Sequence, residues 1–264
     1  MWINGSDLVD HSRDAQTMAL QGYCLFSVPL ELKRRLREAV LGTLAKSCGY
    51  SDLSLAALSQ QIMALSEDQF RADFAKPNRF FEPDLAPDLM RFAQDCAERV
   101  GAREGQISLV SPAEIEANSQ LTPSSLDAFW RCVRPGREDV GRPHADVQFW
   151  ELARGTSSEP YHSTAYDRRI KVWIPLAGCD PSNGLRVISG SHLEAVPFKS
   201  FMTPNGVRPD IDQFWLDQRQ FISPINQYET DCVIFHDRLV HMGPNNDSAN
   251  IRISCEFTVL VKDH

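Results

Sequence analysis

The segment PHAD places an imidazole and a carboxylate two positions apart, at His144 and Asp146. In a β-strand successive side chains alternate between the two faces, so this pair would point to one side of a sheet. A second imidazole from a distant strand would complete a two-His, one-carboxylate triad, which leaves coordination positions open for oxygen chemistry at non-haem Fe(II). His241, at the end of DCVIFHDRLVH, is the best candidate. His-x-Asp alone is weak evidence, because a hydrogen-bonded pair at a strand end has the same pattern.

A cation and a hydroxyl follow the second histidine on one predicted strand. Arg252 lies eleven residues after His241, and Ser254 lies two residues further on the same strand face. An arginine can form a bidentate pair with a dicarboxylate, and the serine hydroxyl can add a hydrogen bond. The neighbours Ile251 and Ile253 are apolar, which favours an arginine that faces a buried interior and needs an anionic partner. The alternative is an ordinary surface arginine on an edge strand.

Short β-rich runs beyond Gln106 must position these side chains. The candidates are ISLV, DAFWRCVR, ADVQFW, RIKVWIPL, LRVIS, DCVIFH and IRISCEFTVL, separated by turn signals such as RPGRED and GPNNDS. Many short strands without alternating helices predict an antiparallel sandwich or jelly roll. Apolar stripes at helical spacing in 31–49, 55–65 and 87–100 predict helices before them. We expect one domain over residues 1–264, with largely helical support in 1–105 and a jelly-roll core in 106–264.

Composition argues against several classes of protein. The net charge is -8 and there is no run of lysine or arginine, so we expect a small-molecule partner and no nucleic acid. The N-terminal residues lack the pattern of a signal peptide, and no apolar run is long enough for a membrane span, so we expect a cytoplasmic location. The seven cysteines form no CxxC pair, which favours reduced thiols over a zinc knuckle or a disulfide framework.

From about Gly22 to Val261 the chain resembles the phytanoyl-CoA dioxygenase family of Fe(II)- and 2-oxoglutarate-dependent oxygenases. The resemblance rests on GYCLFSVPLELKRRL, PHAD, KVWIPLAGCDPSNGLRVISGSH and HMGPNNDSANIRIS, in this order. The third segment is similar to the family's NG-L-x-x-x-PGSH signature, and the fourth to its H-G-x-x-N-x-S-x-x-x-R pattern. Ser189 stands where the family usually has proline, and Met242 separates His241 from the glycine that often follows directly. These departures concern the subfamily more than the chemistry.

The resemblance implies a double-stranded β-helix buttressed by helices. It also implies that His144, Asp146 and His241 hold Fe(II), that Arg252 binds the C5 carboxylate of 2-oxoglutarate, and that Trp173 lines the co-substrate pocket. The implied reaction consumes dioxygen, releases succinate and CO2, and hydroxylates an unactivated C–H bond, with ascorbate as the reductant in vitro. Desaturation, ring closure and epimerisation remain open as other outcomes. The substrate's identity and the oligomeric state are not predicted.

The run RIKVWIPL has two different faces. Its apolar face comprises Ile170, Val172, Ile174 and Leu176, and the other face comprises Arg169, Lys171, Trp173 and Pro175. If helices cover the outside of the barrel, the second face turns inward toward the site. Lys171 could then contact 2-oxoglutarate or substrate, or else be a solvated lysine at a sheet edge.

The segment 151–169 joins two strands that should end near the metal, and loops at such places often determine specificity. Tyr161, His162 and Arg168 are its candidate substrate contacts, and their chemistry suits a hydroxyl-rich or anionic small metabolite. A solvated surface loop would have a similar composition. Two other classes of function stay open: a cupin-like metal-dependent isomerase or lyase, and a catalytically silent jelly-roll binding protein. The combination of Arg252 with the ligand set disfavours both.

Overall fold

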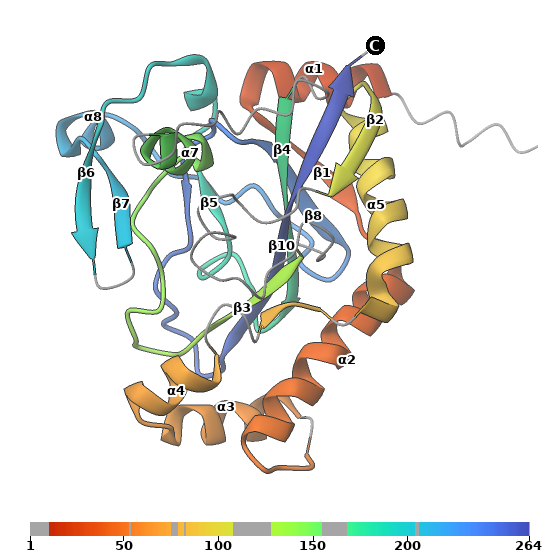
Figure 1. Ribbon diagram of the computed structural model, residues 1–264, viewed down its shortest axis with the longest axis vertical. Helices are drawn as coiled ribbons and strands as arrows, with labels where there is room; N and C mark the ends of the chain where they lie inside the picture. The colour runs from red at the N-terminus through yellow and green to blue at the C-terminus, as the bar shows by residue number, and fades with distance from the viewer. Residues whose placement is uncertain are drawn as a thin grey trace, which may run out of the picture.

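A six-stranded antiparallel sheet forms the centre of the protein, as the computed structural model in Figure 1 shows. The structure describes residues 11–52, 54–74, 79–81, 83–107, 128–154, 168–203 and 206–263. The strands run in the order β1-β8-β4-β10-β2, and β3 also pairs with β10. Their bounds are β1 Tyr23–Ser27, β2 Ala102–Ile107, β3 Phe129–Val133, β4 Arg168–Ala177, β8 Asp231–His236 and β10 Arg252–Asp263.

Two short antiparallel ladders complete the β structure. One joins β5 (Arg186–Val187) to β9 (His241–Met242), and the other is a hairpin of β6 (Phe198–Thr203) and β7 (Gly206–Ile211). The β5–β9 ladder faces the main sheet through a small apolar cluster that includes Val187, Trp173 and Phe235. The hairpin and α7 lie together on one side of the molecule (Figure 1).

Helices cover the other face of the main sheet. The described helices are α1 His11–Gln21, α2 Leu30–Ser47, α3 Leu55–Ala64, α4 Glu67–Asp73, α5 Ala86–Arg99, α7 Asp146–Arg154, α8 Gln213–Asp217 and the 3-10 turns Pro83–Leu85 and Ser191–Leu193. Of these, α7 and α8 pack with the β6–β7 hairpin and do not belong to the covering layer. The largest apolar cluster joins side chains of α2 and α5, such as Leu36 and Phe92, to Ile170, Val172 and Phe257 of the sheet. Burying each such side chain contributes roughly 1.5–3 kcal/mol, so this layer dominates the stability of the fold.

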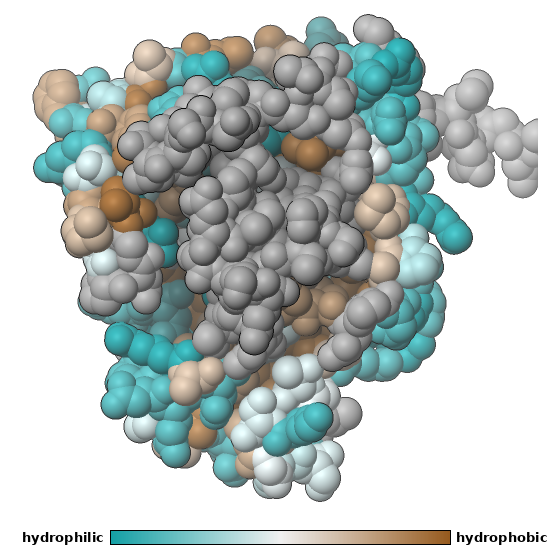
Figure 2. All heavy atoms as spheres, in the orientation of Figure 1, coloured by the Kyte–Doolittle hydropathy of each residue, from teal (hydrophilic) through white to brown (hydrophobic). Residues whose placement is uncertain are grey.

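Most of the predicted elements are confirmed. The stripes in 31–49, 55–65 and 87–100 form α2, α3 and α5. The outer surface of the molecule over α5 and β2 is mainly hydrophilic (Figure 2). The fold class, mainly β with N-terminal helices, is also confirmed. The helical first part contains a strand that was not predicted, β1, which is only five residues long and pairs with β8. No helix in the described part of the chain is long and apolar enough to cross a membrane.

The prediction of a strand for ADVQFW is wrong. Residues Asp146–Arg154 form α7, and the backbone N–H of Ala145 donates to the side-chain oxygen of Gln148 at its start (3.0 Å). An acidic first residue favours a helix N-terminus because it faces the positive end of the helix dipole. A short apolar run of this length does not distinguish a strand from a buried helix.

Candidate iron and 2-oxoglutarate site

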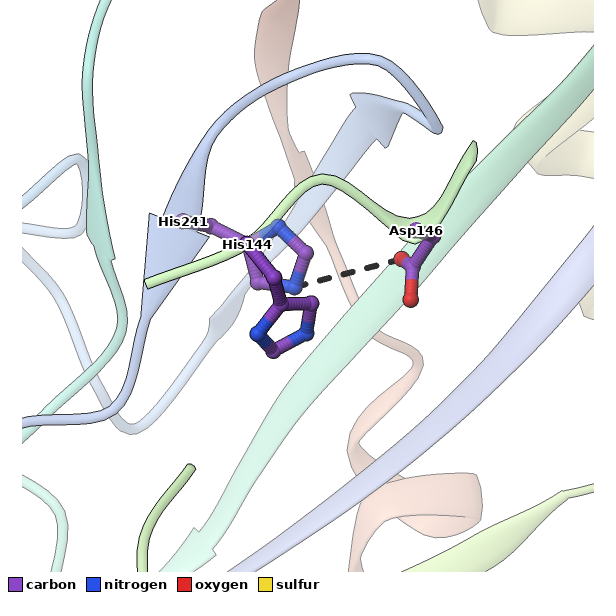
Figure 3. Close-up of side chains that lie close together, drawn as sticks. All are labelled: His144, Asp146 and His241. Atoms are coloured by element: carbon purple, nitrogen blue, oxygen red, sulfur yellow. Dashed lines mark ion pairs between the residues drawn. The ribbon is translucent and has the colours of Figure 1, made fainter. Parts of the chain in front are cut away.

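The three predicted ligands meet on the inner face of the sheet, the face turned away from α2 and α5. Ligand atoms of His144, Asp146 and His241 all lie within 4.8 Å of one another, and the imidazoles and the carboxylate point toward one another (Figure 3). The Nε2 atom of His241 is 3.9 Å from Oδ2 of Asp146. Such a set of two imidazoles and one carboxylate fits Fe(II).

The secondary structure that positions the three side chains differs from the prediction. His144 and His241 form an isolated antiparallel bridge through two backbone hydrogen bonds of 3.1 and 2.9 Å, and Asp146 is the first residue of α7. The bridge sets the two imidazoles side by side, with ring centroids 4.5 Å apart. The chain then turns into α7, which brings the carboxylate of Asp146 toward the imidazoles. Alternation of side chains along a strand therefore does not explain why His144 and Asp146 lie close together.

Hydrogen bonds orient both imidazoles for metal binding. The Nδ1 atom of His144 lies 2.8 Å from the carbonyl oxygen of Arg142, and Nδ1 of His241 lies 3.0 Å from that of Leu239. A carbonyl only accepts, so each Nδ1 carries the proton and each Nε2 keeps a lone pair for a metal ion. Oδ2 of Asp146 is buried without a hydrogen-bond partner in the described part of the chain, which leaves that oxygen available as a ligand too.

The protonation states suit a cation at this point. Burial, together with the neighbouring His241, lowers the pKa of His144 to about 4, so the ring is neutral at pH 7. Burial acts to raise the pKa of Asp146, but Lys171 and the two imidazoles outweigh it and hold this pKa below its usual value. Metal ligands must be deprotonated, and the pKa values of His144 and Asp146 meet this requirement at pH 7.

The predicted co-substrate residues line the inner face beside the triad. Arg252 is 5% exposed, and its Nη1 donates to the carbonyl oxygens of Asn183 and Pro244. Its Nε is buried without a hydrogen-bond partner among the described residues, so the guanidinium retains donor capacity for an anion. Ser254 is buried two residues further along β10. The backbone of Gly243 lies against the guanidinium, since a Cβ there would be 2.7 Å from Nη2.

The inward orientation of Lys171 and Trp173 agrees with the two-faced pattern of RIKVWIPL. The apolar face of that strand packs in the helical cluster, and Trp173 packs in the cluster on the inner side. Nζ of Lys171 is 3.9 Å from Oδ2 of Asp146, and its side chain is 11% exposed. Lys171 is therefore an interior cation that helps to keep the carboxylate of Asp146 ionised, and the alternative of a solvated edge lysine is wrong.

The three predicted substrate residues differ in what the structure says of them. Tyr161 and His162 lie outside the described residues. Arg168 is described, and it pairs with Asp263 (2.8 Å) and donates to the carbonyl oxygen of Val100 (2.8 Å), which ties β4 to the end of β10 and to α5. The described contacts of Arg168 are thus structural, and its role with substrate stays a prediction.

Sequence reasoning missed other charged residues of the inner face. Arg131 of β3 is in register with Ser254, and its Nε donates to Glu256, which is in register with Trp173. The available signal was the one that marked Arg252: Arg131 stands between the apolar residues of FWRCV. Arg208, on the unpredicted β6–β7 hairpin, was missed as well.

A family model described as Phytanoyl-CoA dioxygenase (PhyH) matches residues 42–254, well over half of the chain. The chain belongs to the phytanoyl-CoA dioxygenase family. The predicted family is thereby confirmed, and the match together with the His-Asp-His group supports the predicted cofactors, iron and 2-oxoglutarate. A comparison with curated proteins gives no match.

Solved structures of similar fold include enzymes with different reaction outcomes. The carbocyclase SnoK from nogalamycin biosynthesis is 16% identical, with a TM-score of 0.55 and coverage of 94% of this chain and 83% of that one. EctD from S. alaskensis, crystallised with 2-oxoglutarate and 5-hydroxyectoine, is 16% identical (TM-score 0.53; coverage 99% and 79%). The epimerase SnoN, in complex with Fe3+, alpha ketoglutarate and a nogalamycin compound, is 14% identical (TM-score 0.50; coverage 95% and 83%). At these identities the likeness establishes the jelly-roll fold.

Proposed function

We propose that this protein is an Fe(II)- and 2-oxoglutarate-dependent dioxygenase that hydroxylates an unactivated C–H bond of a small polar metabolite or natural-product intermediate. The observation that carries the proposal is the convergence of His144, Asp146 and His241 on the same sheet face as the buried Arg252. A cupin-like isomerase or lyase needs the metal ligands alone. A buried arginine with an unused donor needs an anion, which a dicarboxylate co-substrate supplies.

In this proposal the protein's residues bind and orient, while the iron and 2-oxoglutarate supply the oxidising power through oxidative decarboxylation to succinate and CO2. The two imidazoles would hold the metal through Nε2, and Asp146 would hold it through a carboxylate oxygen. Lys171 keeps Asp146 ionised. A metal held by these three ligands would keep open positions, which co-substrate and dioxygen chemistry requires.

Arg252 is proposed to neutralise the C5 carboxylate of 2-oxoglutarate, with Ser254 as a second donor and Trp173 as a wall of the pocket. A charge-assisted hydrogen bond is stronger where water is excluded, and Arg252 is almost completely buried. Hydrogen bonds to two backbone carbonyls fix the guanidinium before the co-substrate arrives, which reduces the entropy lost on binding.

Hydroxylation is one of several outcomes that this chemistry allows, and product mass distinguishes them. The purified protein with Fe(II), 2-oxoglutarate and ascorbate would be incubated with a mixture of polar metabolites under 18O2. We expect a product heavier than its precursor by one 18O atom, formed together with succinate. Loss of two hydrogens would indicate desaturation or ring closure, and an unchanged mass with altered retention would indicate epimerisation; either result overturns hydroxylation but retains the oxygenase.

A further inference from the structure

Arg131 lies on the inner face of the sheet, and its side chain is only partly used in the contacts that the structure describes. It is in register with Ser254, and cross-strand neighbours lie on one side of a sheet, so it faces the same side as the co-substrate residues. Its Nε donates to Glu256, whose side chain is only 12% exposed. The Arg131 side chain is nevertheless 44% exposed. Within the described part of the chain, its two terminal nitrogens are left for another acceptor.

A second arginine approaches the triad from the β6–β7 hairpin. Arg208 extends from β7, and its guanidinium carbon lies 5.7 Å from the centroid of the Phe149 ring. That ring is in turn 5.0 Å from the imidazole of the predicted ligand His144. Arg208 and His144 therefore contact the same aromatic ring, that of Phe149. Its Nη1 donates to the carbonyl oxygen of Val207, and no carboxylate among the described residues pairs with it.

The cations of this region exceed the carboxylates that could neutralise them. Arg131 repels Arg208, and this repulsion adds to burial in lowering the pKa of Arg208. A further arginine, Arg79, lies over the Phe129 ring that Arg131 also contacts, at 5.9 and 5.4 Å from its centroid. Burial and, to a smaller extent, the charge of Arg131 lower the pKa of Arg79 to about 10.

Bound co-substrate would not balance these charges. Beside the triad, the described part of the inner region holds the cations Lys171, Arg252, Arg131, Arg208 and Arg79, against the carboxylates Asp146 and Glu256. Fe(II) and the dianion 2-oxoglutarate compensate each other, so both together leave the excess of positive charge unchanged. An excess of positive charge in a partly buried region is unfavourable unless an anion accompanies it.

We propose that Arg131 and Arg208 bind an anionic group of the organic substrate, a carboxylate or a phosphate, and so hold the substrate between the metal triad and the β6–β7 hairpin. This inference rests on the proposed function, because it concerns the second ligand of the same site. The planar guanidinium fork suits both oxyanions, which it binds through two parallel hydrogen bonds. Arg252 anchors the co-substrate, and the other two arginines select an acidic substrate.

Calorimetry on the full chain tests this without knowledge of the substrate. The protein would be loaded anaerobically with Mn(II) and saturating 2-oxoglutarate, and then titrated with inorganic phosphate, with 3-phenylpropionate and with 3-phenylpropionamide. We expect the two anions to bind and the amide not to bind. Arg131→Gln and Arg208→Gln should each weaken anion binding about tenfold or more, while the affinity for 2-oxoglutarate is unchanged. Arg142→Gln is the matched control, because Arg142 contacts the same hairpin through Asp210 (2.7 Å) and is 61% exposed.

Each contrary result has a distinct meaning. Equal binding of acid and amide, absence of anion binding, or unchanged anion binding in both variants overturns the anionic-substrate inference. Weaker 2-oxoglutarate binding in Arg131→Gln overturns it too, because Arg131 would then belong to the co-substrate site. Arg208→Gln leaves no described carboxylate without its partner, so it keeps the test valid if Arg131→Gln fails to fold. A wild-type protein that does not bind 2-oxoglutarate with metal contradicts the proposed function instead.

Discussion

Gly243 offers a sharp test of the role of Arg252, because a single methyl group there would displace the guanidinium. In Gly243→Ala the new Cβ would lie 2.7 Å from Nη2 of Arg252, whereas ordinary contacts begin at 3.4 Å. The guanidinium must therefore move by about 0.7 Å. It cannot swing into solvent, since Arg252 is 5% exposed and its Nη1 is held by the carbonyls of Asn183 and Pro244.

A displacement of this size should weaken co-substrate binding measurably. A misplacement of about 1 Å in a catalytic site can cost on the order of 100-fold, so we expect about a tenfold rise in the 2-oxoglutarate Kd, or about 1.4 kcal/mol. Anaerobic calorimetry with Mn(II) in place of Fe(II) measures that Kd, and the Mn(II) affinity without co-substrate should be unchanged. Gly141→Ala is the control, because a Cβ at Gly141 meets nothing within 4 Å. A 2-oxoglutarate Kd equal to that of the wild type would refute the placement of the co-substrate carboxylate at Arg252.

Three further substitutions probe the ligands, the anchor and the fold. His241→Ala should lower the metal affinity more than about 100-fold while the circular dichroism spectrum stays that of the folded protein, because loss of a direct ligand should exceed the effect of an outer-shell partner. Full metal affinity would show that the triad is misassigned. Arg252→Ala should raise the 2-oxoglutarate Kd about 30-fold or more, from the roughly 2–5 kcal/mol that a truncated buried charge pair costs; a change below threefold would contradict this. Gly178→Ala should lower the free energy of unfolding by at least about 1–3 kcal/mol, since Gly178 has a φ of +63° and its Cβ would meet the carbonyl oxygen of Ile251. Denaturant titration measures that loss, and unchanged stability would mean that the backbone relaxes there.

Much of the fold could be predicted because local pattern and tertiary packing agree. RIKVWIPL alternates between two faces, and the sheet buries one face under the helices and the other over the site, so the pattern alone indicates both. ADVQFW alternates as well, with Ala145, Val147 and Phe149 apolar and Asp146 and Gln148 polar. The pattern therefore indicates a strand, although the residues from Asp146 onward form a helix. The β6–β7 hairpin was overlooked although the sequence contains the dipeptide Asn205-Gly206, a common hairpin signal.

The candidate site was predictable to the extent that its residues occur in motifs. His144, Asp146, His241 and Arg252 stand at recognisable spacings, and the structure brings the three ligands together and places the arginine on the same sheet face. Arg208 has no motif around it. Its approach to the triad arises from the packing of the hairpin against α7, a contact between segments that are distant in the sequence.

Succinate formation from 2-oxoglutarate tests the central claim most directly. The purified protein would be incubated with 2-oxoglutarate, ascorbate and dioxygen, with and without Fe(II), in parallel with Asp146→Ala. We predict succinate and CO2 in equal amounts, formed only when Fe(II) and dioxygen are both present, and lost in the variant because the metal then lacks its carboxylate ligand. Succinate formed at the same rate by Asp146→Ala, or no succinate from the wild type over a wide range of candidate substrates, would contradict the account.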